Sequence, residues 1–182
     1  MSTLTPKAEA PTQGGSVFVS RTPSRTLVTW VAILSFVVGF GAILGGLGGM
    51  WYTYDQAATQ DITTPDDAAI PSTPVRGPFT MWAQADIITH HQLDRTEGLF
   101  YAQMPRFVDQ VDENGEPVIG EDGEVVQVPN EARSSWFSAT TLTNALSLGI
   151  LAYALGFMAV AFGALFVLNG FLFWSLRPVR MT

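Results

Sequence analysis

The sequence predicts an all-α membrane protein in which two transmembrane helices form an antiparallel hairpin carrying a mostly helical extracytoplasmic module. Two uncharged runs, 27–50 and 134–176, interrupt an otherwise charged chain of 182 residues. Only 14% of the residues are charged, against about 25% in a typical soluble domain, and the mean hydropathy is +0.24. The segment between the runs has 15 acidic residues and four arginines, a net charge of −11. The acidic pI of 4.6 and the absence of a basic patch exclude a nucleic-acid partner.

The first uncharged run, Leu27 to Met50, predicts a transmembrane helix at 27–50. As a helix its 24 residues would be about 36 Å long, enough for a bilayer core of about 30 Å. Trp30 and Trp51 stand near its two ends, as is typical at membrane interfaces. The run is longer than the apolar part of a signal peptide and no A-x-A site follows it, so we expect a retained anchor.

The second uncharged run has 43 residues and would be about 65 Å long as one helix, too long for a single crossing. Its first part is polar, so it is expected to stand outside the membrane. The second transmembrane helix is therefore predicted at 148–176, with the crossing itself from Leu148 to Trp174.

Arginines near the membrane ends predict the orientation. Arg21 and Arg25 precede the first run, and Arg177 and Arg180 follow the second. The positive-inside rule then places both tails, a disordered 1–26 and 177–182, in the cytoplasm and the module 51–147 outside the plasma membrane. The lipid bilayer is accordingly the first predicted partner.

Small residues in the two runs predict how the helices pack. In the first run glycines repeat every four residues, and in the second every seven with alanines between them, so each set lies along one helix face. Lipid gives little hydrophobic drive for association, so close approach through small residues supplies the packing. The interface is predicted at Gly41, Gly45, Gly49, Gly149, Gly156, Gly163 and Gly170.

An antiparallel hairpin would place the glycines of the first run against Gly149 to Gly156, leaving Gly163 and Gly170 without a partner in the chain. Two interpretations stay open. The extra glycines reflect the ordinary enrichment of membrane helices, or they continue the packing face for a second copy or another membrane subunit, with the Asn169 amide available for a hydrogen bond. Neither run contains an acidic, basic or histidine residue, which argues against an ion or proton pathway.

The first half of the module divides at Pro78. Residues 55–78 contain four prolines and predict an extended connector. Pro78 is well placed to open a helix that Gly98 would stop. One face of this helix is expected to pack against residues 136–147, and it consists of Trp82, Ala85, Ile88 and Gln92.

The second half of the module has weaker signals. Residues 99–110 predict a second short helical piece limited by Pro105. The pairs Asn114-Gly115 and Asp122-Gly123 are turn signals within an acidic stretch, which forms either a small β-hairpin or an irregular loop. Glu131 is expected to enter the long helix that leads into the membrane.

The helix after Pro78 contains both histidines of the chain, His90 and His91. Asp86, His90 and Asp94 are spaced by four and share a helix face, so they are candidate ligands for a divalent metal. The competing interpretation is that His90 makes surface pairs with these carboxylates, while His91 pairs with Arg95 or packs inward. The two histidines project about 100° apart and cannot easily chelate one ion.

The segment GPFTMWAQADIITHHQLD resembles a family of small two-span membrane proteins of actinobacteria, which carry a G-P-F-x-x-W-A-Q-A-D-x-I-x-x-H-H segment outside the membrane. The resemblance is close over 77–94 and loose from Leu27 onwards, whereas the acidic insert at 109–130 looks particular to this chain. The matching residues are Gly77, Pro78, Phe79, Trp82, Ala83, Gln84, Ala85, Asp86, His90 and His91.

Members of that family are sometimes labelled aromatic ring-opening dioxygenases. Extradiol cleavage needs an iron held by two well-separated histidines and a carboxylate inside a pocket. Two adjacent histidines on one helix cannot supply that set within one copy, so we interpret the label as a misannotation.

The sequence has no cysteine, which excludes thiolate catalysis and iron–sulfur clusters and leaves the module to be ordered by packing. No nucleophile elbow, P-loop or zinc-protease motif occurs. We expect a non-enzymatic membrane protein without a cofactor, an accessory or scaffold subunit of a plasma-membrane assembly. The alternative is an extracytoplasmic metal- or ligand-binding sensor built on the Asp86, His90 and Asp94 face.

Overall fold

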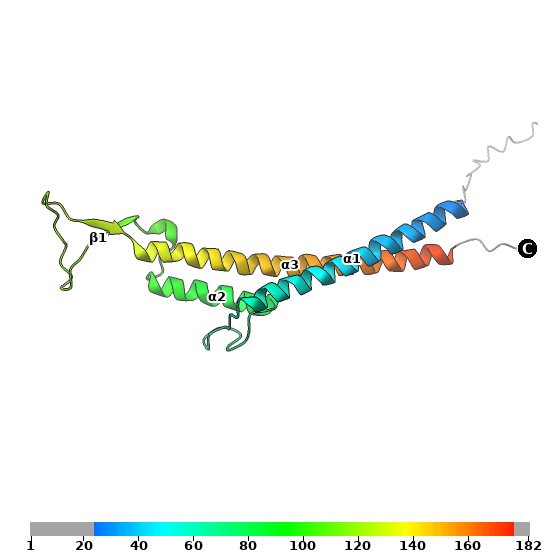
Figure 1. Ribbon diagram of the computed structural model, residues 1–182, viewed down its shortest axis with the longest axis horizontal. Helices are drawn as coiled ribbons and strands as arrows, with labels where there is room; N and C mark the ends of the chain where they lie inside the picture. The colour runs from blue at the N-terminus through cyan, green and yellow to red at the C-terminus, as the bar shows by residue number, and fades with distance from the viewer. Residues whose placement is uncertain (1–23, 177–182) are drawn as a thin grey trace, which may run out of the picture.

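The computed structural model describes residues 24–176 and is mostly helical (Figure 1). Residues 1–23 of the predicted tail 1–26, and the whole predicted tail 177–182, lie outside the described residues. The prediction of disorder is wrong for Arg25 and Thr26, which already belong to α1. The elements in chain order are helix α1 (Arg25–Thr59), helix α2 (Pro78–Arg95), the 3-10 turn η1 (Tyr101–Gln103), strands β1 (Phe107–Asp109) and β2 (Gln127–Pro129), and helix α3 (Glu131–Ser175).

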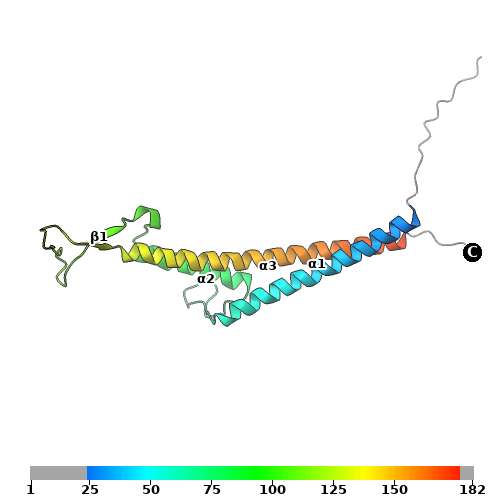
Figure 2. The same cartoon turned by 45° about the horizontal axis from the view of Figure 1, so that its top comes forward.

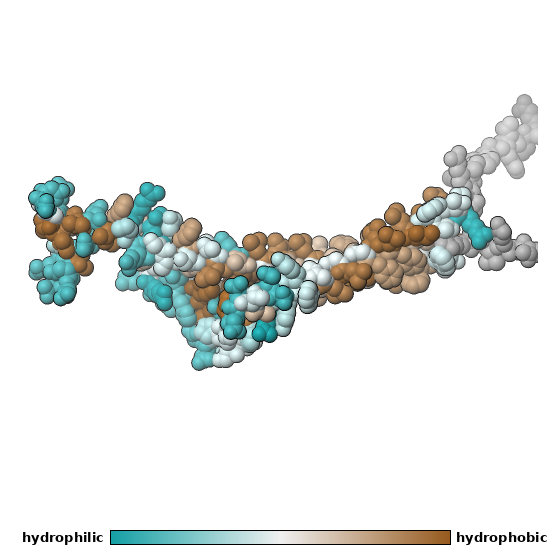
Figure 3. Space-filling model, in the orientation of Figure 1, coloured by the Kyte–Doolittle hydropathy of each residue, from teal (hydrophilic) through white to brown (hydrophobic). Residues whose placement is uncertain are grey.

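Helices α1 and α3 are long and apolar enough to cross a membrane. Only 22% and 17% of their most apolar stretches are buried, so most of the apolar side chains face outward rather than into a core. Figure 3 shows this apolar surface over the half of the molecule where α1 and α3 lie side by side, with hydrophilic residues gathered toward the opposite end. In both ribbon views the two ends of the described chain lie together, far from the β-strands (Figures 1 and 2).

The two long helices make backbone contact through glycines. A Cβ atom on Gly39 would lie 2.8 Å from the carbonyl oxygen of Gly163, and one on Gly46 would lie 2.6 Å from that of Gly156. The ring of Phe36 packs against Gly170. As residue numbers rise along α1, the contacts move down α3. The α3 glycines of these contacts recur every seven residues, and Gly39 and Gly46 of α1 are also seven apart, which is the period of left-handed helix packing.

The structure corrects the predicted interface on α1. A Cβ atom added to Gly41, Gly45 or Gly49 would meet no other atom within 4 Å, so these three glycines lie outside the contact. The four-residue glycine repeat runs across the helix at an angle to the seven-residue contact line. Gly163 and Gly170, expected to lack a partner, are both covered by α1.

The predicted extended connector is instead a compact loop at 60–77. Buried Thr64 ties it together: its hydroxyl donates to the carbonyl of Ile70 at 2.5 Å and accepts the backbone N–H of Thr73 at 2.9 Å. The N–H of Val75 donates to the carbonyl of Ile62, which brings the two ends of the loop together. Prolines fix the local turns, and these hydrogen bonds close the loop over α2.

Helix α2 begins at Pro78, as predicted. The Thr80 hydroxyl accepts the backbone N–H groups of Arg76 and Gly77, both at 3.1 Å, which satisfies donors at the start of the helix. The helix ends at Arg95, and Gly98 follows with a φ of +80°. A residue with a left-handed backbone conformation commonly follows the C-terminus of a helix.

Helix α2 lies along the first half of α3, and the predicted packing face is only partly correct. The Gln92 amide donates to the Ser135 hydroxyl at 2.6 Å, and Ile88 packs on the cluster of Met104, Trp136 and Ala139. The prediction is wrong for Trp82, because its side chain is 53% exposed. The apolar face of α2 is centred one residue earlier, where Met81 packs beside Tyr153 of α3.

Residues 99–129 form turns and strands rather than the predicted short helix. Only η1 is helical, and Met104 turns the chain into β1, which pairs antiparallel with β2. Both predicted turns occur, with Gly115 and Gly123 at φ near +80°. Backbone N–H groups of Glu116 and Asn114 donate to the Asp112 carboxylate and hold its pKa below the usual value.

Candidate functional site

The histidine helix does not assemble the predicted metal site. His90 pairs with Asp94 at 3.7 Å, and both side chains are about two-thirds exposed. Within residues 24–176, no three His, Asp or Glu side chains come close enough together to share a metal ion. A single exposed pair of this kind provides two ligands at most, so Asp86, His90 and Asp94 are a solvated helix face in this arrangement.

His91 contacts the compact loop instead of Arg95. Its Nε2 lies 2.6 Å from Asp67 Oδ2, and because a carboxylate only accepts, the ring nitrogen is the donor. This hydrogen bond keeps the pKa of Asp67 below its usual value. Ile87 and Ala83, one and two turns before His91, are buried on the same face of α2, so the loop at 60–77 covers that face.

The side of α1 that faces away from α3 is open along the apolar segment. Gly41, Gly45 and Gly48 leave space where their side chains would be, and Tyr52 continues the same line at intervals of three and four residues. Tyr52 also lines the larger cavity described below. We call this surface the glycine face.

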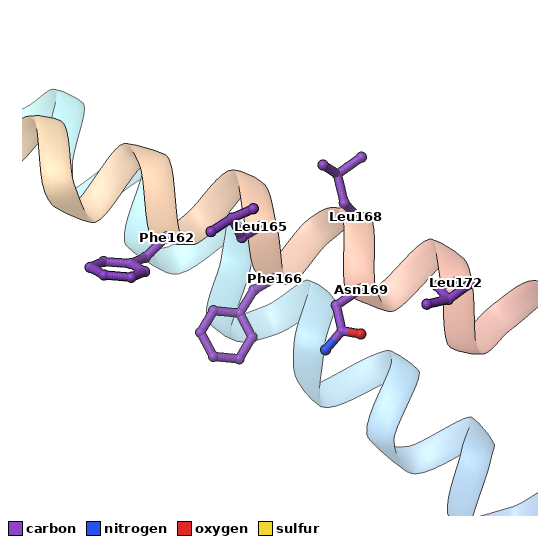
Figure 4. Close-up of a pocket in the computed structure, with 6 residues that line it drawn as sticks. All are labelled: Phe162, Leu165, Phe166, Leu168, Asn169 and Leu172. Carbon is purple, nitrogen blue, oxygen red and sulfur yellow. The ribbon is translucent and has the colours of Figure 1, made fainter.

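Asn169 lies on the exposed surface of α3. Figure 4 shows its carboxamide projecting from α3 among apolar side chains in a shallow hollow. The Asn169 side chain is exposed. The hollow is lined by Phe162, Leu165, Phe166, Leu168, Asn169 and Leu172.

A larger cavity lies where the end of α1, the start of α2 and the middle of α3 meet. Its volume is about 680 Å³, and its walls are mainly aliphatic. Gly149 lets α2 approach: a Cβ atom there would lie 2.7 Å from the sulfur of Met81. None of the residues that line the cavity carries a charge, and its polar groups come chiefly from Gln56 of α1, Gln60 just after α1 and Gln84 of α2.

Gln84 is the residue of chemical interest in this cavity. Its Oε1 atom is buried and has no hydrogen-bond partner. Sequence reasoning missed this role and placed Gln84 only within the family-like segment. A signal was present, because Gln84 interrupts the apolar line from Met81 to Ile88 at helical spacing, but its meaning depends on what α1 and α3 place opposite it.

The remaining residues of the family-like segment have local roles or face solvent. Gly77 and Pro78 start α2, Ala83 is buried, and Phe79 is 76% exposed beside Trp82. Comparison with protein-family models, with curated proteins and with solved structures finds no match to this chain.

Proposed function

We propose that the chain is a non-enzymatic integral membrane protein of the plasma membrane, acting as an accessory or scaffold subunit whose glycine face docks another membrane helix. The observation that carries the proposal is the open line of Gly41, Gly45 and Gly48 on a helix whose opposite side is already packed on α3. Closely spaced glycines allow the backbone-to-backbone approach by which membrane helices associate. The docked helix belongs to a second copy or to a different subunit.

Asn169 on α3 also supports docking of a neighbouring helix. A carboxamide in a lipid-facing position gains from a hydrogen bond to a neighbouring helix, because lipid offers no alternative partner. In the proposed topology α1 and α3 are an antiparallel transmembrane hairpin, crossing at 27–50 and 148–176, with both termini in the cytoplasm. Residues 51–147 then form the extracytoplasmic module, and the resemblance to two-span actinobacterial proteins agrees with this arrangement.

The test compares the full-length protein with matched variants on native gels after extraction from its membrane in a mild detergent. The Gly41→Leu/Gly45→Leu and Asn169→Leu variants are expected to shift an assembly toward the monomer. Ala154→Leu/Ala161→Leu adds similar bulk at exposed positions of α3 outside the glycine face, and is expected to leave the assembly unchanged. A wild-type protein that runs strictly as a monomer without a partner would refute the scaffold role.

A further inference from the structure

We propose that the cavity between α1, α2 and α3 binds a neutral lipid, an alkyl chain whose head group carries a hydroxyl or amide hydrogen-bond donor. The cavity is built within one copy of the chain and does not depend on docking at the glycine face, so it adds a binding activity to the proposed scaffold role.

Size and shape agree with a small-molecule site. Its volume of about 680 Å³ falls within the range of about 300–1,000 Å³ that ligand pockets usually have. Three elements from distant parts of the sequence form the walls, with Tyr52 on α1, Met81 on α2 and Leu146 on α3. Ala145, Gly149 and Ala152 have short side chains or none on the α3 wall, so space remains between the helices.

The position of the cavity favours a lipid. On α3 its lining runs from Leu142 to Ala152, across the predicted start of the membrane crossing at Leu148, and on α1 it begins directly after Trp51. With the hairpin placed as proposed, the cavity lies at the level where alkyl chains meet head groups. Lipids are the molecules most concentrated at that level.

The chemistry of the walls selects a neutral head group. No lysine, arginine or histidine lines the cavity to balance a phosphate or carboxylate, and no acidic residue lines it to balance an ammonium group. Taking an uncompensated charge out of water is costly, so charged head groups are disfavoured here.

Glutamine side chains specify what the head group must supply. Gln56 and Gln60 line the cavity, and each carries a carbonyl-type acceptor on an exposed side chain. A hydroxyl or amide N–H on the ligand would donate to these acceptors, while the alkyl chain contacts the aliphatic walls. A hydrocarbon or ester without a donor would make neither hydrogen bond.

The test uses the purified full-length protein in detergent, with 1-monooleoylglycerol as the probe and methyl oleate as its donor-free analogue, and native mass spectrometry to count bound molecules. The wild type is expected to bind one monooleoylglycerol about tenfold more tightly than methyl oleate. Gln56→Leu/Gln60→Leu should remove that preference without changing the affinity for methyl oleate. Equal affinity of the wild type for the two probes would overturn the role of the two glutamines.

Cavity-filling variants locate the site. Ala152→Phe is expected to weaken monooleoylglycerol binding at least tenfold, whereas Ala154→Phe, an exposed position two residues away that does not line the cavity, should bind as the wild type does. Ala145→Leu provides a milder filling variant if the phenyl ring lowers the yield of folded protein. Unchanged binding by both filling variants, or preferential binding of dioleoylphosphatidylglycerol by the wild type, would overturn the proposal.

Discussion

The Tyr153 hydroxyl donates a hydrogen bond of 2.7 Å to the backbone carbonyl of Arg76, 77 residues earlier in the chain. The guanidinium of Arg76 lies on the Tyr54 ring, 5.9 Å from its centre, and its Nη1 is 3.4 Å from the Tyr54 hydroxyl. Arg76, two residues before the start of α2, thus touches both long helices. This joint fixes where α2 sits against the α1–α3 pair, and therefore the shape of the cavity.

The first prediction concerns this joint. Tyr153→Phe keeps the ring but removes the donor, leaving the Arg76 carbonyl without its partner, and is expected to cost about 1–2 kcal/mol of unfolding free energy. At roughly 2–4 °C per kcal/mol, the melting temperature in detergent should fall by several degrees. Tyr52→Phe is the control, because the Tyr52 side chain is 61% exposed. Equal melting temperatures for the wild type and both variants would show that the joint contributes little.

The second prediction compares adjacent glycines. A methyl group at Gly46 would lie 2.6 Å from the Gly156 carbonyl oxygen, so Gly46→Ala must push α1 and α3 apart and lower stability by about 1–3 kcal/mol. At Gly45 no atom lies within 4 Å, so Gly45→Ala should be neutral or stabilise the helix by up to about 1 kcal/mol. Thermal unfolding of the monomer in detergent measures both changes in stability. A larger loss of stability for Gly45→Ala than for Gly46→Ala would contradict the contact line.

The third prediction is a pH dependence. The Asp67 pKa is lowered in the folded chain, chiefly by the hydrogen bond from His91, so the unfolded chain binds more protons across the interval between the two values. The stabilisation is present above the ordinary Asp value of 3.8 and is lost as the pH falls through the lowered one. Asp67→Asn should therefore melt below the wild type at pH 6, and the difference should shrink as the pH is lowered below 3.8.

The control for this prediction is Asp94→Asn. Asp94 pairs with His90 at 3.7 Å with both side chains well exposed, and surface pairs of this kind contribute little. Its melting curve should follow the wild type across the same pH range. A difference at Asp67→Asn that persists unchanged at pH 3 would contradict the proton linkage.

The fourth prediction concerns the junction between η1 and α3. Trp136 is buried with Met104 and Ala139, and its indole N–H donates to the Leu99 carbonyl at 2.9 Å. Trp136→Phe should cost about 1–3 kcal/mol through the lost hydrogen bond and the reduced volume. Hydrogen exchange should then speed up at 97–106 but not at 39–46. Phe137→Leu, at a position 72% exposed, should leave exchange unchanged in both segments.

Local signals predicted where helices begin. Pro78 with Thr80 two residues later starts α2, and the Asn130 side chain accepts the N–H of Arg133 at the start of α3. The end of α1 was harder to predict, because hydrophobicity stops at Met50 while the helix continues to Thr59 through residues that contain no glycine or proline. Polar residues can continue a helix, so a hydrophobic boundary is not a helix boundary.

Tertiary features depended on information that no single segment contains. Gly39 and Gly46 form the contact with α3 because both helices share a seven-residue period, whereas the more conspicuous four-residue repeat of Gly41 and Gly45 faces outward. Requiring the same period on both helices would have selected the correct pair. The cavity at Gln84 depends on how three elements are placed relative to one another, and no spacing along the sequence encodes that placement.

The unbroken helix α3 also has an electrostatic consequence. Seventeen residues separate Glu131 from Leu148, so with the crossing as proposed the β1–β2 end stands about 25 Å above the membrane boundary. The segment 107–129 carries seven acidic residues and no basic ones. The Debye length at physiological ionic strength is about 8 Å, so salt screens this charge from anionic lipid head groups. The negative tip can therefore extend from an acidic bilayer without being repelled by it, and only soluble or neighbouring molecules at that height experience its field.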